Sequence, residues 1–150
     1  MAAENYSLKI SRTFQAPRAR VFEAWMNPAD LKNWWHMSAD ATTPVAEVDL
    51  RVGGRYRLGM TLPGSAEAIM LGGEFLRVEP PELLEYTWAW ENAGDEPEST
   101  VLVEFRDLGQ STEVVITHGV FVSEQRKEEH LGGWRGCMEQ LDIILAGANA

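Results

Sequence analysis

Apolar and polar residues alternate over residues 6–14. Tyr6, Leu8, Ile10 and Phe14 fall on one side of an extended chain, and Ser7, Lys9, Ser11 and Thr13 fall on the other. A period of two is typical of a strand with one face in the core. The pattern therefore predicts a half-buried first strand, which Ala16-Pro17 ends.

Between residues 17 and 35 the apolar residues recur at helical spacing. Pro17 suits the first turn of a helix, and Asn27-Pro28 closes that helix and opens a second, shorter one. The apolar stripes consist of Val21, Phe22, Trp25 and Met26 in the first helix and Leu31, Trp34 and Trp35 in the second. The sequence thus predicts two short helices directly after the first strand.

Six further strands are predicted between about residues 45 and 118, where the period returns to two. They cover residues 45–52, 56–62, 68–78, 84–90, 101–105 and 114–118. The turn signals between them are Gly53-Gly54, Pro63-Gly64, Pro80-Pro81 and Leu108-Gly109. Gly72-Gly73, inside the strand over 68–78, indicates a bulge or a sharp bend. Residues 91–98 are predicted to form an acidic, exposed loop.

One long helix is predicted to close the chain. It begins after Ser123, which fits the N-cap position, and runs to about Ala146. Its continuous apolar stripe consists of Leu131, Trp134, Met138, Leu141 and Leu145. At about 1.5 Å per residue this helix is roughly 35 Å long, whereas seven antiparallel strands span about 29 Å. An α+β fold in which a curved antiparallel sheet wraps around this helix satisfies the order strand, two helices, six strands, helix.

Length, charge and composition exclude several classes of protein. The chain has 150 residues and a net charge of -10 at pH 7, which fits one domain over residues 1–150 and repels nucleic-acid phosphates. No apolar run approaches the ~20 residues of a membrane span, and Met1 to Leu8 lacks the pattern of a secretion signal. Cys137 is the only cysteine, which excludes an internal disulfide. We therefore expect a cytoplasmic protein with neither a nucleic-acid nor a membrane partner.

Three groups of residues, in their order and spacing, resemble a known family. They are Arg12-Thr-Phe-Gln-Ala-Pro with Val21-Phe-Glu-Ala-Trp and Pro28-Ala-Asp-Leu-Lys-Asn-Trp-Trp; Gly53-Gly-Arg-Tyr with Gly73-Glu-Phe-Leu-Arg-Val-Glu-Pro-Pro-Glu-Leu-Leu-Glu-Tyr-Thr-Trp; and His130, Gly133-Trp134, Cys137 and Leu141. Together they are similar to the SRPBCC (START-like, helix-grip) superfamily, and more narrowly to its branch homologous to the heat-shock ATPase activator (activator of Hsp90 ATPase homologue-like). The likeness runs from about residue 6 to 146.

The resemblance implies a helix-grip fold with a deep, mostly apolar cavity between the sheet and the long helix. It implies no single activity, because relatives include lipid or polyketide binders, cyclases and co-chaperone domains. No shared catalytic motif carries across, so the activity has to be argued from the residues of this chain.

Aromatic and thioether side chains supply candidate walls for such a cavity. The chain has six tryptophans, and indoles offer flat, rigid contact surfaces to a ligand. The candidate ligand-binding residues are Trp35, Tyr56, Met60, Met70, Phe75, Tyr86, Trp88, Trp90, Phe105, His118, Trp134 and Met138. Each of them is also a normal constituent of a solid core.

Three glycines interrupt the predicted long helix: Gly132, Gly133 and Gly136. Each costs about 1 kcal/mol relative to alanine in a helix, so a compensating role is expected. Two explanations remain open. The glycines leave space for a ligand beside Trp134, or they allow close packing of the helix or a local kink.

Polar candidates are few. His118 shares the alternation of Val114 and Ile116 and is expected to face inward, either as a hydrogen-bonded structural residue or as a group that orients a ligand. His130 and Cys137 lie two helical turns apart, ~10 Å, which is too far for a thiol–imidazole dyad. The sequence contains no zinc spacing, phosphate loop or nucleophile elbow. We therefore expect no metal and no cofactor, and we assign no catalytic residue.

The leading hypothesis is that the chain binds an apolar or aromatic small molecule in a cavity between the sheet and the long helix, as a monomer or a homodimer. One alternative is an enzyme of the cyclase or hydrolase type that uses the same cavity. The other is a co-chaperone-like protein-interaction domain. Convergent ionisable groups in the cavity would favour catalysis, and a broad exposed apolar patch would favour a protein partner.

Overall fold

The computed structural model describes residues 6–38, 40–91 and 98–148. In these residues the chain forms one antiparallel sheet and three helices. In chain order the elements are β1 (Tyr6–Phe14), α1 (Arg18–Met26), α2 (Pro28–Trp34), β2 (Thr42–Val48), β3 (Arg55–Thr61), β4 (Ile69–Glu79), β5 (Leu83–Trp90), β6 (Ser99–Asp107), β7 (Thr112–Phe121) and α3 (Glu124–Ala148). The strands lie in the order β1-β7-β6-β5-β4-β3-β2, and every neighbouring pair is antiparallel. The predicted α+β, helix-grip arrangement of a curved antiparallel sheet and a long C-terminal helix is confirmed.

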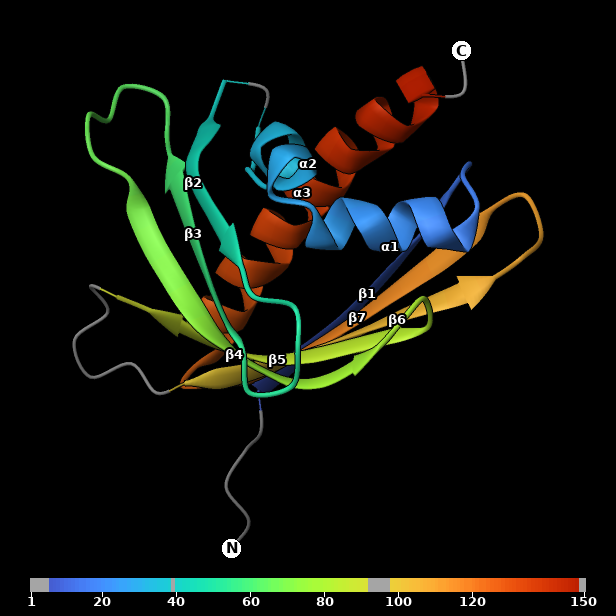
Figure 1. Ribbon diagram of the computed structural model, residues 1–150. Helices are drawn as coiled ribbons and strands as arrows, with labels where there is room; N and C mark the ends of the chain where they lie inside the picture. Colours follow the sequence, from blue (N-terminus) through green and yellow to red (C-terminus); the bar gives the residue numbers. More distant parts are fainter. Residues whose placement is uncertain (1–5, 39, 92–97, 149–150) are drawn as a thin grey trace, which may run out of the picture.

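The sheet is strongly curved, and α3 lies across its concave face. Figure 1 shows β2 and β3 standing on one side of α3, while β5, β6, β7 and β1 run beneath it. The strand that joins these two parts is β4, and it carries the two glycines for which the sequence predicts a bend. A Cβ atom at Gly73 would overlap the backbone carbonyl of Thr87 in β5, and one at Gly72 would lie 2.7 Å from the carbonyl oxygen of Tyr56 in β3. Glycine therefore lets three strand backbones approach closely where the sheet changes direction.

The second strand differs from its prediction. β2 ends at Val48, whereas the alternation predicts a strand over residues 45–52. Beyond Val48 the backbone turns: the Asp49 N–H donates to the Arg55 carbonyl, and Gly53 adopts a φ of 84°. Leu50 and Val52 continue the alternation but are 39% and 64% exposed, because the chain has already left the sheet.

The long helix packs on the sheet as its apolar stripe predicts. The stripe side chains Trp134, Met138, Leu141 and Leu145 are all buried. The Ser123 hydroxyl accepts a hydrogen bond from the Arg126 N–H at 3.2 Å, which confirms the predicted N-cap. None of the helices in the described ranges combines the length and the hydropathy needed to cross a membrane.

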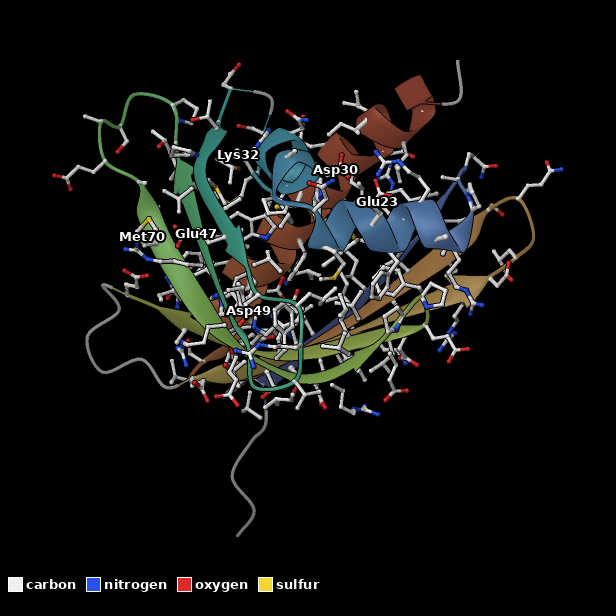
Figure 2. The ribbon with its side chains drawn as sticks, viewed as in Figure 1. Glu23, Asp30, Lys32, Glu47, Asp49 and Met70 are labelled. Carbon is white, nitrogen blue, oxygen red and sulfur yellow. The ribbon has the colours of Figure 1, made fainter. Side chains whose placement is uncertain are left out.

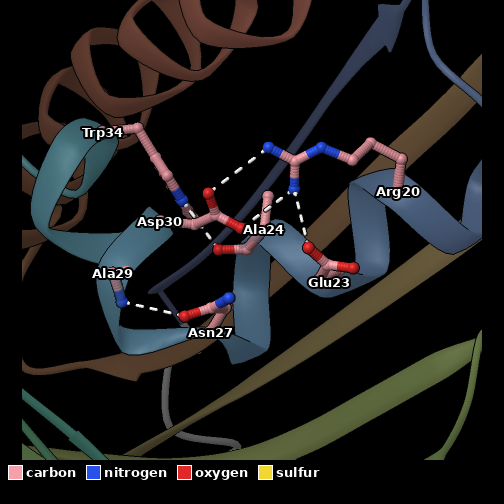
Figure 3. A network of polar contacts seen from close by, with 7 residues as sticks. All are labelled: Arg20, Glu23, Ala24, Asn27, Ala29, Asp30 and Trp34. Atoms are coloured by element: carbon pink, nitrogen blue, oxygen red, sulfur yellow. Dashed lines mark hydrogen bonds and ion pairs between the residues drawn. The ribbon is translucent and has the colours of Figure 1, made fainter. Parts of the chain in front are cut away.

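Side-chain hydrogen bonds hold the junction between α1 and α2 (Figure 3). The Asn27 side chain accepts a hydrogen bond from the Ala29 N–H, and the Trp34 indole donates to the Ala24 carbonyl, both at 2.9 Å. The Trp34–Ala24 bond and an ion pair between Arg20 of α1 and Asp30 of α2, 2.9 Å apart, tie α2 to α1, while the Asn27 bond caps the first turn of α2. The chain then continues directly into Trp35, so the junction also positions the segment that follows α2.

Replacing Asn27 with alanine is expected to lower the free energy of unfolding by about 1 kcal/mol, because the first turn of α2 loses its cap. Asn27→Ser keeps a side-chain oxygen at the same position and should lose much less. Urea denaturation of the three proteins measures the difference. Equal midpoints for the alanine and serine variants would contradict the capping role.

Candidate functional site

A cavity of about 600 Å³ lies between α3, the β3–β4 hairpin, β5 and the segment after α2. Its volume is within the usual range for small-molecule sites. The lining residues are Trp35, Met37, Met60, Leu62, Ile69, Trp88, Trp90, Arg126, Glu129, His130, Gly133, Trp134 and Cys137. The two charged residues in this set, Arg126 and Glu129, both come from the first turns of α3, so the cavity has one polar side and otherwise apolar walls.

The cavity is apolar inside and charged at its rim. Trp35, Trp88 and Trp134 are at most 5% exposed, whereas Met37 at the edge is 39% exposed. Arg126 pairs with Glu129 one helical turn away, with 2.7 Å between Nη1 and Oε1. A molecule that entered would meet indole and thioether surfaces within and an ion pair at the opening.

The structure brings five of the candidate ligand-binding residues together around this cavity: Trp35, Met60, Trp88, Trp90 and Trp134. They come from the end of α2, from β3, from β5 and from α3. Alternation placed Met60, Trp88 and Trp90 on the inner face of their strands, and helical spacing placed Trp134 on the inner stripe. Their convergence depends on the curvature of the sheet, which brings β3 and β5 to the same stretch of α3.

Three other candidates form a packed cluster away from the cavity. Tyr56, Phe75 and Tyr86 have ring centroids 5.1 to 5.9 Å apart, around a space of only about 20 Å³. The Tyr56 hydroxyl donates to the Thr87 carbonyl at 2.6 Å. Burial raises the pKa of both phenols, so they stay neutral. Their arrangement is that of an aromatic core.

The remaining apolar candidates also lie outside the cavity lining. Phe105 packs against Phe22 and Trp25 of α1, and Met138 is fully buried. Met70 lies on the outer face of β4, away from α3, as Figure 2 shows. It pairs in register with Gly59, whose missing side chain leaves room for the Met70 thioether.

Seven lining residues were not among the candidate ligand-binding residues: Met37, Leu62, Ile69, Arg126, Glu129, His130 and Cys137. Gly133, which also lines the cavity, is one of the glycines that the sequence offers as space for a ligand. Those on α3 recur every three or four residues on the face of Trp134, so helical spacing was a usable signal for them. Ile69 pairs with Met60 across the β3–β4 hairpin, and only the register reveals that. Met37 lies in an irregular segment, for which the sequence pattern carries no signal.

His118 is buried behind the cavity wall and supports it. The Trp134 indole donates to His118 Nδ1 at 3.0 Å, and His118 Nε2 lies 2.9 Å from the Ser99 hydroxyl. Because Nδ1 accepts, the neutral ring carries its proton on Nε2 and donates it to Ser99. Burial, together with His130 nearby, lowers the pKa of His118 to about 3. His118 is thus a hydrogen-bonded residue that orients Trp134, and it does not line the cavity.

His130 repeats this arrangement at the cavity itself. The Trp90 indole donates to His130 Nε2 at 3.0 Å, and His130 Nδ1 lies 2.7 Å from the Arg126 carbonyl. With Nε2 accepting, the proton sits on Nδ1 and is donated to that carbonyl. Two indole–imidazole hydrogen bonds therefore fix the planes of two of the tryptophans in the cavity wall.

All six tryptophans belong to one continuous set of ring contacts. The set runs from Trp34 through Trp25 and Trp134 to Trp88, with branches from Trp88 to Trp90 and Trp35, and the successive centroid separations are 4.6, 6.4, 5.5, 5.6 and 6.0 Å. An unbroken series of ring contacts therefore leads from Trp34, at the α1–α2 junction, to the tryptophans of the cavity wall.

The three helix glycines have different roles. A Cβ atom at Gly136 would overlap the backbone carbonyl of Met37, so this glycine allows the segment after α2 to lie directly on α3. A Cβ atom at Gly133 would meet only the Met37 side chain, whose sulfur lies at 3.4 Å, and Gly133 lines the cavity. Gly132 has nothing within 4 Å of the same position. The two explanations left open by the sequence thus apply to different residues: close packing to Gly136 and cavity space to Gly133.

The titratable groups near the cavity favour a neutral interior. Burial raises the pKa of the Cys137 thiol to about 12, so it is not a thiolate at neutral pH. In the described part of the chain no three His, Cys, Asp or Glu side chains gather in a way that could hold a metal ion. The shape and lining of the cavity suit an uncharged molecule that is bound and oriented there.

Comparisons with known proteins agree with this geometry. The family model of activator of Hsp90 ATPase homolog 1-like proteins matches residues 15–146. No curated protein matches the chain. Among solved structures, CalU16 from Micromonospora echinospora is 27% identical, with 93% of this chain and 75% of that chain covered and a TM-score of 0.69. A protein from Arthrobacter aurescens is 26% identical over 95% and 87%, with a TM-score of 0.77.

A third structure shares the fold. Protein CV1439 from Chromobacterium violaceum is 24% identical, with 93% of this chain and 96% of that chain covered and a TM-score of 0.81. The resemblance carried by the sequence strings is confirmed, since the family model spans nearly the same residues. The chain belongs to the activator of Hsp90 ATPase homolog 1-like family within the SRPBCC superfamily.

Proposed function

We propose that the chain binds an apolar or aromatic small molecule in the cavity between the sheet and α3. The observation that carries this proposal is a cavity of about 600 Å³ walled by tryptophans and methionines. Burial of about 300 Å² of apolar ligand surface would contribute about 7 kcal/mol, from which the cost of immobilising the ligand is subtracted. The partner is a small molecule, and the protein acts as a cytoplasmic monomer or homodimer.

The pKa values favour binding over the cyclase or hydrolase alternative. A general acid or base works best with a pKa near the operating pH. Burial raises the pKa of the Cys137 thiol, which lines the cavity, to about 12, far above neutral pH. This thiol therefore stays uncharged, which suits a ligand that leaves water for an apolar site.

Mass spectrometry of the purified protein under native conditions tests the proposal, because a bound small molecule adds its mass to the folded chain. A co-purifying molecule, or an added flat aromatic probe such as fluorene, should appear at one copy per chain. The absence of any adduct with a panel of such probes would overturn the proposal.

Gly133→Leu is expected to abolish this binding while the protein stays folded, because the leucine side chain would extend past the Met37 sulfur into the cavity. Fluorene at 100 times its dissociation constant should stabilise the parent by ~2.7 kcal/mol, which is about 5–11 °C in melting temperature. The variant should show no such shift.

Gly132→Leu is the matched control for this experiment. It makes the same substitution one residue away, where nothing lies within 4 Å of the added Cβ. It should keep the full melting response to fluorene. If both leucine variants respond like the parent, the probe binds elsewhere and the cavity assignment is wrong.

A further inference from the structure

A second, much smaller space lies next to the cavity inside the protein. It measures only about 20 Å³, and the residues around it include Tyr56, Leu58 and Tyr86. Among the described residues, Trp35 is the one that lines both this inner space and the cavity of about 600 Å³. Trp35 is itself only 3% exposed. The two spaces therefore meet at a buried tryptophan.

The two spaces follow one another along the same strands. On β3, Met60 lines the cavity and Leu58, the preceding inward residue, lines the inner space. On β5, Trp88 lines the cavity and Tyr86, the preceding inward residue, lines the inner space. Both steps lead in the same direction, because β4 lies between these strands and is antiparallel to both. The inner space thus continues the cavity along the sheet, about 7 Å farther on.

Trp35 stands where these two stretches join. Its ring packs against Trp88 of the cavity wall, with centroids 6.0 Å apart. Its backbone is anchored on both sides: the N–H donates to the Leu31 carbonyl of α2 at 2.9 Å, and the carbonyl accepts from the Thr43 hydroxyl of β2 at 2.6 Å. Because two elements hold this backbone and other side chains surround the ring, the indole forms the inner end of the cavity.

We propose that Trp35 determines the size of the ligand, because its indole closes the cavity towards the inner space. The proposal rests on the proposed function and narrows it to compact apolar molecules. A longer molecule would leave its additional length at the mouth, where Met37 and Ile69 are 39% and 40% exposed. Only apolar surface that leaves water adds to the affinity, so additional length brings the parent little gain.

Shortening Trp35 should join the two spaces. Trp35→Ala vacates the volume of an indole beside the inner space, and an apolar cavity of about 150 Å³ is already enough to bind benzene. A phenyl group attached to fluorene could then extend past position 35 towards Tyr86. Because the loss of a buried indole also lowers stability, Trp35→Leu serves as a second variant that removes less of the side chain.

Calorimetry with fluorene and 2-phenylfluorene tests the proposal, because the two probes share one tricyclic skeleton and differ by one phenyl ring. The parent should bind both with similar affinity. Trp35→Ala should bind 2-phenylfluorene about tenfold more tightly than fluorene. Trp90→Ala is the matched control, since it removes an equal indole that lines the cavity but not the inner space. An equal preference for 2-phenylfluorene in Trp90→Ala would mean that Trp35 has no special role.

Proton NMR locates the phenyl group of the long probe. In Trp35→Ala, or in Trp35→Leu if the alanine variant does not fold, the phenyl protons should show nuclear Overhauser effects to the ring protons of Tyr86. In the parent no proton of 2-phenylfluorene should do so. The measurement on the parent does not depend on any variant folding, and a contact between the probe and Tyr86 there would overturn the proposal.

The two proposals fail in different ways. If neither probe binds the parent, the proposed function is overturned and the size limit falls with it. If fluorene binds the parent but 2-phenylfluorene already contacts Tyr86, the role of Trp35 alone is wrong. The same holds if the ratio of the two affinities is unchanged in the folded Trp35 variants.

Discussion

Acidification from pH 7 to pH 4 is expected to lower the free energy of unfolding by about 3 kcal/mol through His118 alone. The buried ring has a pKa of about 3 in the folded protein, compared with 6.5 for an unperturbed histidine. Below pH 6.5 His118 binds a proton in the unfolded chain but stays neutral in the folded protein, so the free energy of unfolding decreases as the pH falls towards 3. Above pH 6.5 both states are neutral at this position, and the effect is absent.

The His118→Gln variant isolates this contribution. A glutamine amide has an acceptor for the Trp134 indole and a donor for Ser99 but does not titrate. Urea denaturation of both proteins at several pH values gives the difference, in which other titrating groups cancel, including His36, whose pKa is also lowered by burial. The parent should lose about 1.4 kcal/mol more per pH unit than the variant between pH 6 and 4. Parallel pH profiles would show that His118 is not held neutral by the fold.

Gly136→Ala is expected to destabilise the protein by about 1–3 kcal/mol, although alanine is the better helix former by about 1 kcal/mol. The added methyl group would overlap the Met37 carbonyl, and both partners are backbone-anchored, so neither moves without displacing its element. The substitution therefore destabilises the protein by weakening the packing of the segment after α2 on α3.

The Gly132→Ala variant is the control on the same helix. Its methyl group meets no atom within 4 Å, so only the helix propensity changes and stability should rise by about 1 kcal/mol. Denaturation midpoints of the two variants should therefore move in opposite directions. A Gly136→Ala protein as stable as Gly132→Ala would mean that the segment carrying Met37 does not lie on α3.

The sequence was a good guide to the elements because each has an uninterrupted period. The strand over residues 6–14 and the stripe from Leu131 to Leu145 are both found where the pattern predicts them. The failure at Leu50 and Val52 has a simple cause. Alternation reports which side a residue would face in a strand, but it does not report where the chain loses its partner strand.

The site was harder to predict than the fold because periodicity assigns a face and not a position along it. Tyr86 and Trp88 are both inward residues of β5, yet only Trp88 reaches the cavity. The difference depends on where β4 bends at Gly72 and Gly73 and on where the segment after α2 crosses α3. Both are tertiary contacts between residues far apart in sequence. Met70 was assigned to the wrong face of its strand. Its neighbour Leu71 lies on the inner face of β4, and successive strand residues point to opposite sides, so Met70 lies on the outer face.

The continuous set of tryptophan contacts gives the protein a built-in optical reporter. Indoles at centroid separations of 4.6 to 6.4 Å are close enough for their excited states to couple, so excitation energy absorbed by one ring is shared with its neighbours in the set before emission. The fluorescence and near-ultraviolet circular dichroism of the chain are then collective properties of all six rings rather than sums of independent signals. An occupant that touches only the cavity rings would alter the spectrum of the whole set, including rings that it never contacts.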